Sequence, residues 1–202
     1  MSRRVYISAD YDLNNGDRAV VNELVMWSND NKHKTDFIDM SKVVSGTVAE
    51  EPDCRICDLK AEFNRQINAS SAVIFVVGAF TASRIAGNAC QRMDKQWWEC
   101  TCTPYKGNAN GAKQCKYSSV SPATDGNVGY INSYSYLRHE FEQTKKKNKT
   151  IIVVYNSLNK QPSWLPSYLK GYESVAQPFW MNNYWGDKVG NYQYIKKVLG
   201  YE

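Results

Sequence analysis

Glu140 is the side chain whose type and position best suit chemistry. It follows Tyr136 on a predicted amphipathic helix on which Leu137, Phe141 and Thr144 share one face, and Glu140 falls beside that face. A carboxylate at the edge of a buried helix face is costly unless something uses its charge. In a water-poor cleft, such a fixed anion can stabilise positive charge that develops on a substrate.

Other interpretations of the acidic and histidine side chains stay open. An ordinary acid in the first turn of a helix, favoured by the helix dipole, would give the same pattern around Glu140. Glu99 is a rival, but it leads into Cys100 rather than into a helix and a buried strand. His139 neighbours Glu140 but points about a third of a turn away, so we expect it to be a surface histidine, as we do His33.

Strands and helices alternate along most of the chain. Continuous β-branched runs predict strands that are buried on both faces, as in a parallel sheet. The predicted strands are 5–8, 35–39, 71–78, 151–155 and, more weakly, 175–180. Four helices are predicted. The first has its N-cap at Asp17, the second starts at 52–53 after a loop at 40–51, the third carries Glu140, and the fourth spans 192–199. This alternation favours an open α/β sheet with right-handed crossovers.

Residues 84–135 interrupt the alternation. They are rich in Cys, Gly, Asn, Ser and Tyr and show little helical or strand periodicity. A loop this long inside a compact domain is usually functional, stapled by metal, or mobile. We therefore interpret the chain as a single domain, 1–202, with a long Cys-containing insertion at 84–135 before the glutamate helix.

The cysteines leave two interpretations. Four thiolates can hold zinc and staple a loop that has no core, and the insertion offers Cys90, Cys100, Cys102 and Cys115. The one-residue spacing within the middle pair differs from common zinc knuckles, so free or partly buried thiols are the favoured alternative. The CxxC at 54–57 follows a long loop rather than a strand, which disfavours a redox role.

Composition narrows the setting. The 202 residues are 43% hydrophobic, and the formal net charge is +5. That charge suits an anionic ligand such as a nucleotide, whereas the short lysine clusters fall short of a nucleic-acid-binding stripe. No apolar run reaches the length of a membrane span, and the N-terminus enters a strand almost at once, so we expect no signal peptide, no membrane partner and a cytoplasmic location.

Ligand-binding loops are expected where the parallel strands end. In open α/β sheets, ligands bind beyond the carboxyl ends of the strands. The loops there would begin at Ser8, after Asp39, after Gly78 and after Tyr155. The chain contains neither a GxGxxG fingerprint nor a Walker P-loop, so the sequence gives no support to a dehydrogenase or an ATPase.

Three segments together resemble a known family. Residues 4–8 form a strand that runs into an Asp-containing loop, and 67–78 form a helix-to-strand segment that ends in hydrophobic-Gly-x-x-Thr at Thr81. An aromatic-x-x-x-Glu helix with Glu140 is then followed by a basic stretch and the strand 151–155. In this order and spacing the chain resembles the TIR-like domains, in particular the bacterial branch found in Thoeris anti-phage defence.

The resemblance implies a fold and an activity. The fold would be a flavodoxin-like open parallel sheet with helices on both faces. Active members of the family cleave NAD at the nicotinamide–ribose bond, as glycohydrolases or ADP-ribosyl cyclases, and the catalytic glutamate carries over to Glu140. NAD or a related dinucleotide would then be a substrate, with no separate cofactor. The product would be a cyclic or conjugated ADP-ribose that reaches an effector protein by diffusion.

The same resemblance suggests substrate-binding residues. They are Ser8, Ala9, Asp10, Phe80 and Thr81, in the loops after two of the strands. Ser8 would hydrogen-bond a ribose or phosphate, and Phe80 would stack on a base. In the alternative, Ser8 and Asp10 only cap the loop and Phe80 packs in the core.

Two further functions remain as alternatives. Many TIR-like domains only self-associate or bind partners, and a long insertion with Tyr and Trp suits an interface. A nucleoside deoxyribosyltransferase-like enzyme would also break an N-glycosidic bond on a similar sheet. If the protein is an enzyme of this family, we expect a homo-oligomer, because TIR-like sites often need a neighbouring subunit to complete them. We also expect a phage-derived trigger.

Overall fold

Five short segments form one parallel sheet, whose strand order is β2-β1-β3-β6-β7. The computed structural model describes residues 3–11, 16–29, 35–47, 55–84, 105–107, 113–115 and 135–201. Within them the sheet strands are β1 (Arg3–Ser8), β2 (Thr35–Ile38), β3 (Ala72–Val77), β6 (Thr150–Tyr155) and β7 (Gln177–Pro178). The central strand β3 is buried along its whole length, as the β-branched run predicted.

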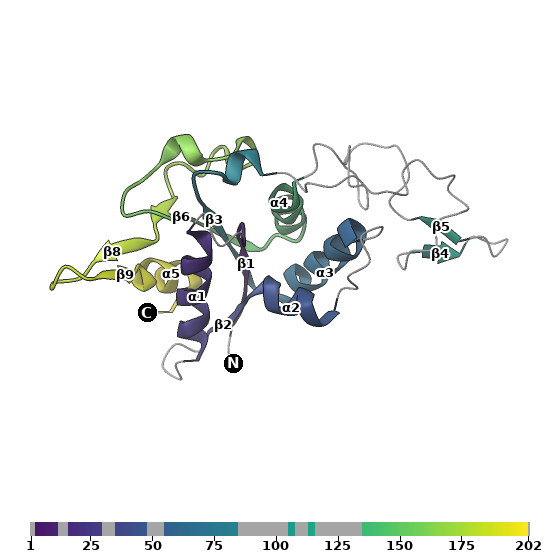
Figure 1. Ribbon diagram of the computed structural model, residues 1–202, viewed down its shortest axis with the longest axis horizontal. Helices are drawn as coiled ribbons and strands as arrows, with labels where there is room; N and C mark the ends of the chain where they lie inside the picture. The colour runs from purple at the N-terminus through teal and green to yellow at the C-terminus, as the bar shows by residue number, and fades with distance from the viewer. Residues whose placement is uncertain are drawn as a thin grey trace.

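Helices cover both faces of the sheet (Figure 1). Helices α1 (Asp17–Ser28) and α5 (Tyr192–Leu199) pack on one face, where alternate residues of β1 such as Val5 and Ile7 form the core. Helices α2 (Met40–Thr47), α3 (Arg55–Ala69) and α4 (Tyr136–Lys146) contribute to the opposite face. Because strand side chains alternate, Tyr6 faces this second core.

This architecture is the flavodoxin-like α/β fold expected from the sequence. The first strand sits inside the sheet, and the chain moves outward from it to β2 on one side and to β3 on the other. The direction of strand addition therefore reverses between β1 and β3, which makes a topological switch point at their carboxyl ends. In doubly wound sheets this switch point is the usual place for a ligand.

Local structure departs from the sequence predictions at three places. The segment predicted as a loop at 40–51 begins with α2. The N-cap of α1 is Gly16, with a φ of +79°, so Asp17 is the first helical residue and not the cap. The weak strand predicted at 175–180 is split into β7 and the start of β8 (Trp180–Asn182). Helix α5 was predicted with its correct bounds.

The region after β7 adds a hairpin at the edge of the molecule. Strand β8 pairs antiparallel with β9 (Lys188–Gly190), and the hairpin projects from the body of the protein (Figure 1). Single turns of 3-10 helix, η3 (Pro162–Trp164) and η4 (Ser167–Leu169), connect β6 to β7. Of the described helices, none is both long and apolar enough to cross a membrane.

The insertion is described at only two short strands. These are β4 (Tyr105–Gly107) and β5 (Lys113–Cys115), which pair antiparallel. Cys90, Cys100 and Cys102 lie outside the described residues, as does the side chain of Cys115. The zinc hypothesis therefore stays a prediction, and so does the interpretation of 84–135 as an insertion within a single domain.

Candidate functional site

Glu140 lies on α4 with its carboxylate facing β1. The helix starts after Ser135, whose hydroxyl accepts a hydrogen bond from the Arg138 backbone N–H at 3.3 Å. Only 3% of Glu140 is exposed. The Tyr6 hydroxyl donates to Glu140 Oε1 at 2.8 Å, and the Ser8 hydroxyl donates to Oε2. Tyr6 and Ser8 are two residues apart on a strand and so point to the same face.

Burial changes the protonation of this carboxyl group. Desolvation raises the pKa of Glu140 to about 7, and the hydrogen bonds from Ser8 and Tyr6 offset part of that rise. Glu140 lies beyond the first turn of α4 and is buried, so the helix-dipole interpretation of this residue is wrong. A carboxyl group with this pKa can exchange its proton near neutral pH, and a nearby cation would hold it ionised.

The charge of the Glu140 carboxylate acts on three tyrosines. The pKa values of Tyr6, Tyr11 and Tyr168 are all raised. The largest cause is burial, and the second is the charge of Glu140. The Tyr11 hydroxyl donates to the Ile7 carbonyl at 2.8 Å and accepts from the Met40 backbone N–H at 3.2 Å. These phenols stay protonated at physiological pH and can act as hydrogen-bond donors.

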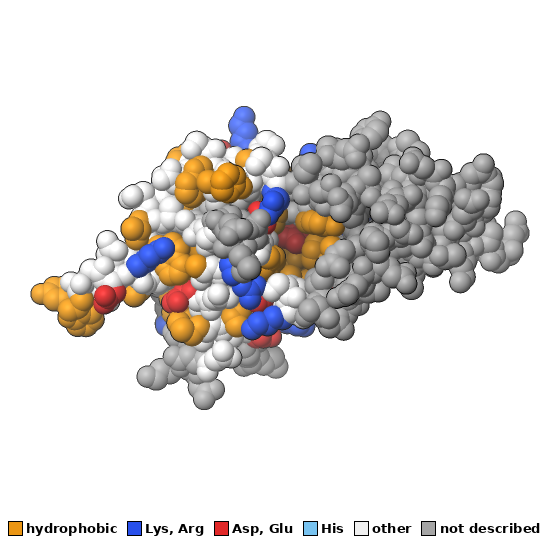
Figure 2. Space-filling view, viewed as in Figure 1, with side chains coloured by type: hydrophobic (Ala, Val, Ile, Leu, Met, Phe, Trp, Pro, Cys, Tyr) orange, Lys and Arg blue, Asp and Glu red, His pale blue; other side chains and the backbone are white. Residues whose placement is uncertain are grey.

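The face that carries α3 and α4 is hollowed. In the space-filling view, an acidic side chain lies at the floor of a hollow bordered by hydrophobic side chains, over the region of α3 and α4 (Figure 2). A concave, mostly apolar surface with a few polar groups is typical of small-molecule sites.

The predicted substrate-binding residues separate into distinct environments. Ser8 contacts Glu140, whereas the Ala9 side chain packs in the core on the α1 side of the sheet. Asp10 is buried and forms an ion pair with Arg84, with 2.7 Å between Oδ2 and Nε. Thr81 is buried, and its hydroxyl accepts from the Gly78 backbone N–H at 2.8 Å, which closes the turn after β3.

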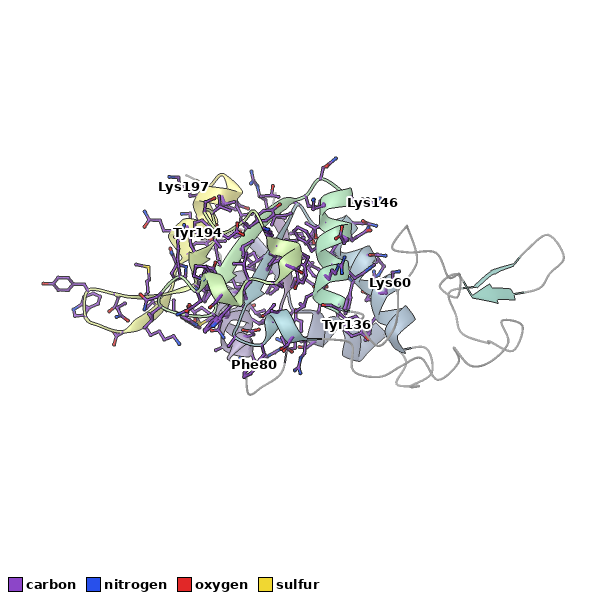
Figure 3. All side chains as sticks on the ribbon, turned by 90° about the horizontal axis from the view of Figure 1, so that it is seen from above. Lys60, Phe80, Tyr136, Lys146, Tyr194 and Lys197 are labelled. Carbon is purple, nitrogen blue, oxygen red and sulfur yellow. The ribbon has the colours of Figure 1, made fainter. Side chains whose placement is uncertain are left out.

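Phe80 is 61% exposed, so the core alternative for this residue is wrong. It lies along the same edge of the molecule as Tyr136, and Lys146 and Lys197 lie along the opposite edge (Figure 3). Because β3 ends just before Phe80 and α4 starts at Tyr136, this edge is the carboxyl-end edge of the sheet. Stacking of Phe80 on a base stays a prediction.

A second buried carboxylate, Asp17, lies on the other side of the same sheet edge. It is the first residue of α1, and 1% of it is exposed. The Asn156 side-chain amide donates to Asp17 Oδ1 at 3.0 Å, and the Asp10 backbone also hydrogen-bonds this carboxylate. Burial raises the pKa of Asp17 to about 7 against these hydrogen bonds.

Two glycines are fitted around this second carboxylate. A Cβ on Gly78 would lie 2.5 Å from Asp17 Oδ1, and a Cβ on Gly16 would lie 2.8 Å from Asn156 Nδ2. The oxygen of the Asn156 amide accepts from the Trp180 indole N–H at 3.1 Å. This network joins the ends of β3 and β6 to the start of α1.

His139 is not the surface residue we expected. Its Nε2 lies 2.9 Å from Asn64 Oδ1 on α3, and burial, with a further contribution from Lys60, lowers its pKa to about 3. The prediction that the His139 side chain points away from Glu140 is confirmed, because His139 contacts Asn64 on α3. His33 and Glu99 lie outside the described residues.

The sequence indicated some of these residues and offered no signal for others. Tyr6 was detectable in principle, because it precedes Ser8 by two residues on a strand. Asp17 drew attention only as a helix cap. Asn156 and Tyr168 come from the loops after β6, where no periodicity pointed to a function.

No group of three or more potential metal ligands occurs in the described part of the chain. Comparisons with known proteins do not extend the description of the site: no protein-family model matches the chain, and no curated protein matches it. The TIR-like resemblance therefore stays a prediction, and the function rests on the geometry of the residues themselves.

Proposed function

We propose that this protein is a TIR-like enzyme that consumes NAD, with Glu140 as its catalytic carboxylate. The observation that carries the proposal is a buried glutamate at the switch point of a flavodoxin-like sheet, held on both oxygens by hydroxyls of β1. Such a group is costly to bury, and a pKa near 7 keeps it available for ionisation.

Cleavage of the nicotinamide–ribose bond can be catalysed by a single carboxylate, without a general acid. When the C1′–N bond breaks, the bonding electrons leave with the already cationic nicotinamide, which departs neutral and needs no proton. Positive charge then builds on the ribose, as in glycoside hydrolysis. The Glu140 carboxylate would stabilise that charge, and either water, which then releases a proton to the solvent, or another acceptor group would add to C1′.

The hydrogen bonds from Tyr6 and Ser8 leave acceptor positions of the Glu140 carboxylate unused. Each carboxylate oxygen has about two acceptor positions, and Tyr6 and Ser8 use one on each oxygen. The remaining positions can accept hydrogen bonds from ribose hydroxyls. The ADP-ribose product, cyclic or conjugated, would serve as a signal to an effector protein in anti-phage defence.

Release of nicotinamide tests the proposal. Purified protein is incubated with NAD, with and without extracts of phage-infected cells, because the enzyme is expected to need a trigger. We expect Glu140→Gln to lower the rate by about 10³-fold. Glu142→Gln is the matched control, since Glu142 is an exposed acid on the same helix. No release by wild-type protein in either condition, or full release by Glu140→Gln, would reject the mechanism.

The hairpin favours a second candidate, a protein-interaction module. At its tip Tyr184 is 95% and Trp185 is 81% exposed, with ring centroids 6.0 Å apart. The turn is ordered, because the Asn183 side-chain oxygen accepts from the backbone N–H groups of Trp185 and Asp187. Exposed Tyr and Trp are enriched in protein interfaces.

Phage protection in cells separates the two candidates. For the enzyme, Glu140→Gln abolishes protection while the oligomeric state in solution is unchanged. For an interaction module, a Tyr184→Ser/Trp185→Ser variant loses both self-association and protection, and Glu140→Gln retains both. Light scattering and a plaque assay measure the two properties.

A further inference from the structure

Tyr168 sits on a turn that is firmly attached to the core beside α4. It is the middle residue of η4, whose neighbour Leu169 is fully buried and donates its backbone N–H to the Pro166 carbonyl at 2.9 Å. The Tyr168 ring packs on Phe141, with centroids 5.7 Å apart and planes at 44°. Phe141 directly follows Glu140, so the backbone of η4 fixes Tyr168 against the part of α4 that carries the carboxylate.

The hydroxyl of Tyr168 is buried without a hydrogen-bond partner among the described residues. A buried polar group without a partner is destabilising, so each such group calls for an explanation. The phenols of Tyr6 and Tyr11 near the same carboxylate have partners in Glu140 and in backbone groups. Tyr168 differs from them, although the charge of Glu140 also contributes to its raised pKa.

We propose that Tyr168 is a substrate-binding residue whose hydroxyl donates a hydrogen bond to the ribose that faces Glu140. Its phenol packs on the α4 side of the sheet, and none of the described residues accepts its hydrogen bond, as is expected of a donor that serves a ligand. This inference rests on the proposed function, because it takes the ribosyl group of NAD as the ligand.

Tyr155 provides a matched control. It is fully buried, and its hydroxyl also lacks a hydrogen-bond partner within the described residues. The charge that acts on Tyr155 is that of Glu173 and not that of Glu140. The two tyrosines therefore share the same unpaired group and differ in packing, since the ring of Tyr168 lies against Phe141, and in which carboxylate's charge acts on the phenol.

Binding of NAD tests the inference without requiring turnover. Isothermal titration with NAD is made on the Glu140→Gln protein, alone and combined with Tyr168→Phe or with Tyr155→Phe. We expect Tyr168→Phe to weaken NAD binding about 10-fold, the effect of one lost neutral hydrogen bond, and Tyr155→Phe to leave binding unchanged. Neither phenylalanine variant should lower the melting temperature by more than about 2 °C, because each removes only an unpaired hydroxyl.

Three outcomes overturn the inference in distinguishable ways. Equal NAD binding by the Glu140→Gln protein with and without the Tyr168→Phe substitution rejects it and leaves the proposed function in place. A fall in melting temperature of about 5 °C or more for Tyr168→Phe shows that the hydroxyl has a structural partner. If neither the wild type nor Glu140→Gln binds NAD, with or without infected-cell extract, the proposed function fails and the inference fails with it.

Discussion

Two buried carboxylates flank the carboxyl-end edge of this sheet, and their surroundings differ in kind. Glu140 is held by the hydroxyls of Tyr6 and Ser8, whereas Asp17 is held by the amide of Asn156 and by backbone. A hydroxyl both donates and accepts and can rotate, but an amide or backbone N–H has a fixed direction. The two carboxylates therefore have similar burial and similar pKa values, but the hydrogen-bond partners of Glu140 can reorient and those of Asp17 cannot.

Packing reinforces the difference. Asp17 fits against Gly78 so closely that a Cβ there would force the carboxylate to shift, and its partner Asn156 donates to Asp17 and accepts from Trp180. Glu140 has an unpaired phenol, that of Tyr168, in its vicinity within the described part of the chain. We interpret the Asp17 network as a structural connection between strand ends, and the Glu140 group as the place where a ligand exchanges hydrogen bonds.

The pH dependence of stability is the largest effect that we expect from the two carboxylates. Both have folded-state pKa values raised to about 7, from 4.5 for Glu140 and 3.8 for Asp17. Between about pH 4 and pH 7 the folded protein therefore binds more protons than the unfolded chain. The free energy of unfolding then falls as the pH rises through this window and stays low above it.

Neutral substitutions should respond differently at the two positions. Glu140→Gln should raise the free energy of unfolding at pH 8 by on the order of 3 kcal/mol, and by little at pH 4. The hydroxyls of Tyr6 and Ser8 can reorient to satisfy a carboxamide. Asp17→Asn should give little or no gain, because one amide oxygen must replace a carboxylate that accepts from both Asn156 and the Asp10 backbone.

Urea denaturation of the wild type and both variants at pH 4, 6 and 8 measures these differences. Glu142→Gln is the control for removal of an exposed charge on α4, and it should shift stability by less than about 0.5 kcal/mol. A loss of stability for Glu140→Gln at pH 8 would show that Glu140 is a structural residue. An equal gain for Asp17→Asn would remove the distinction between the two settings.

Sequence patterns predicted the framework well, because the framework depends on local periodicity. The β-branched runs indicated β3 and β6, and the apolar spacing around Phe141 indicated α4 with Glu140 at its buried edge. The fold class followed from the alternation of strands and helices. What periodicity cannot supply is which side chains from distant segments meet.

The second carboxylate shows this limit. Asp17 and Asn156 are 139 positions apart, and their hydrogen bond depends on the register of β1, β3 and β6. Asp17 also occupies the space that a side chain at Gly78 would fill, and no local pattern around Gly78 indicates that contact. The partial burial of His139 likewise depends on the packing of α3 against α4, which helical spacing alone does not define.

Gly78→Ala tests the rigid half of the comparison. The new methyl group would lie 2.5 Å from Asp17 Oδ1, in a network where Asn156 and backbone limit movement. We expect a loss of about 2 kcal/mol in the free energy of unfolding, typical of overpacking in a filled interior. Urea denaturation at pH 8 measures it.

A double substitution identifies the cause of that loss. In an Asp17→Ala background the carboxylate is absent, so Gly78→Ala should cost much less than it does alone, and the two changes should be strongly non-additive. Additive costs would mean that Gly78 is required for its backbone and not for the space beside Asp17. In that case close packing against Gly78 would no longer distinguish Asp17 from Glu140. The two carboxylates would then differ only in the kinds of hydrogen-bond donor that hold them.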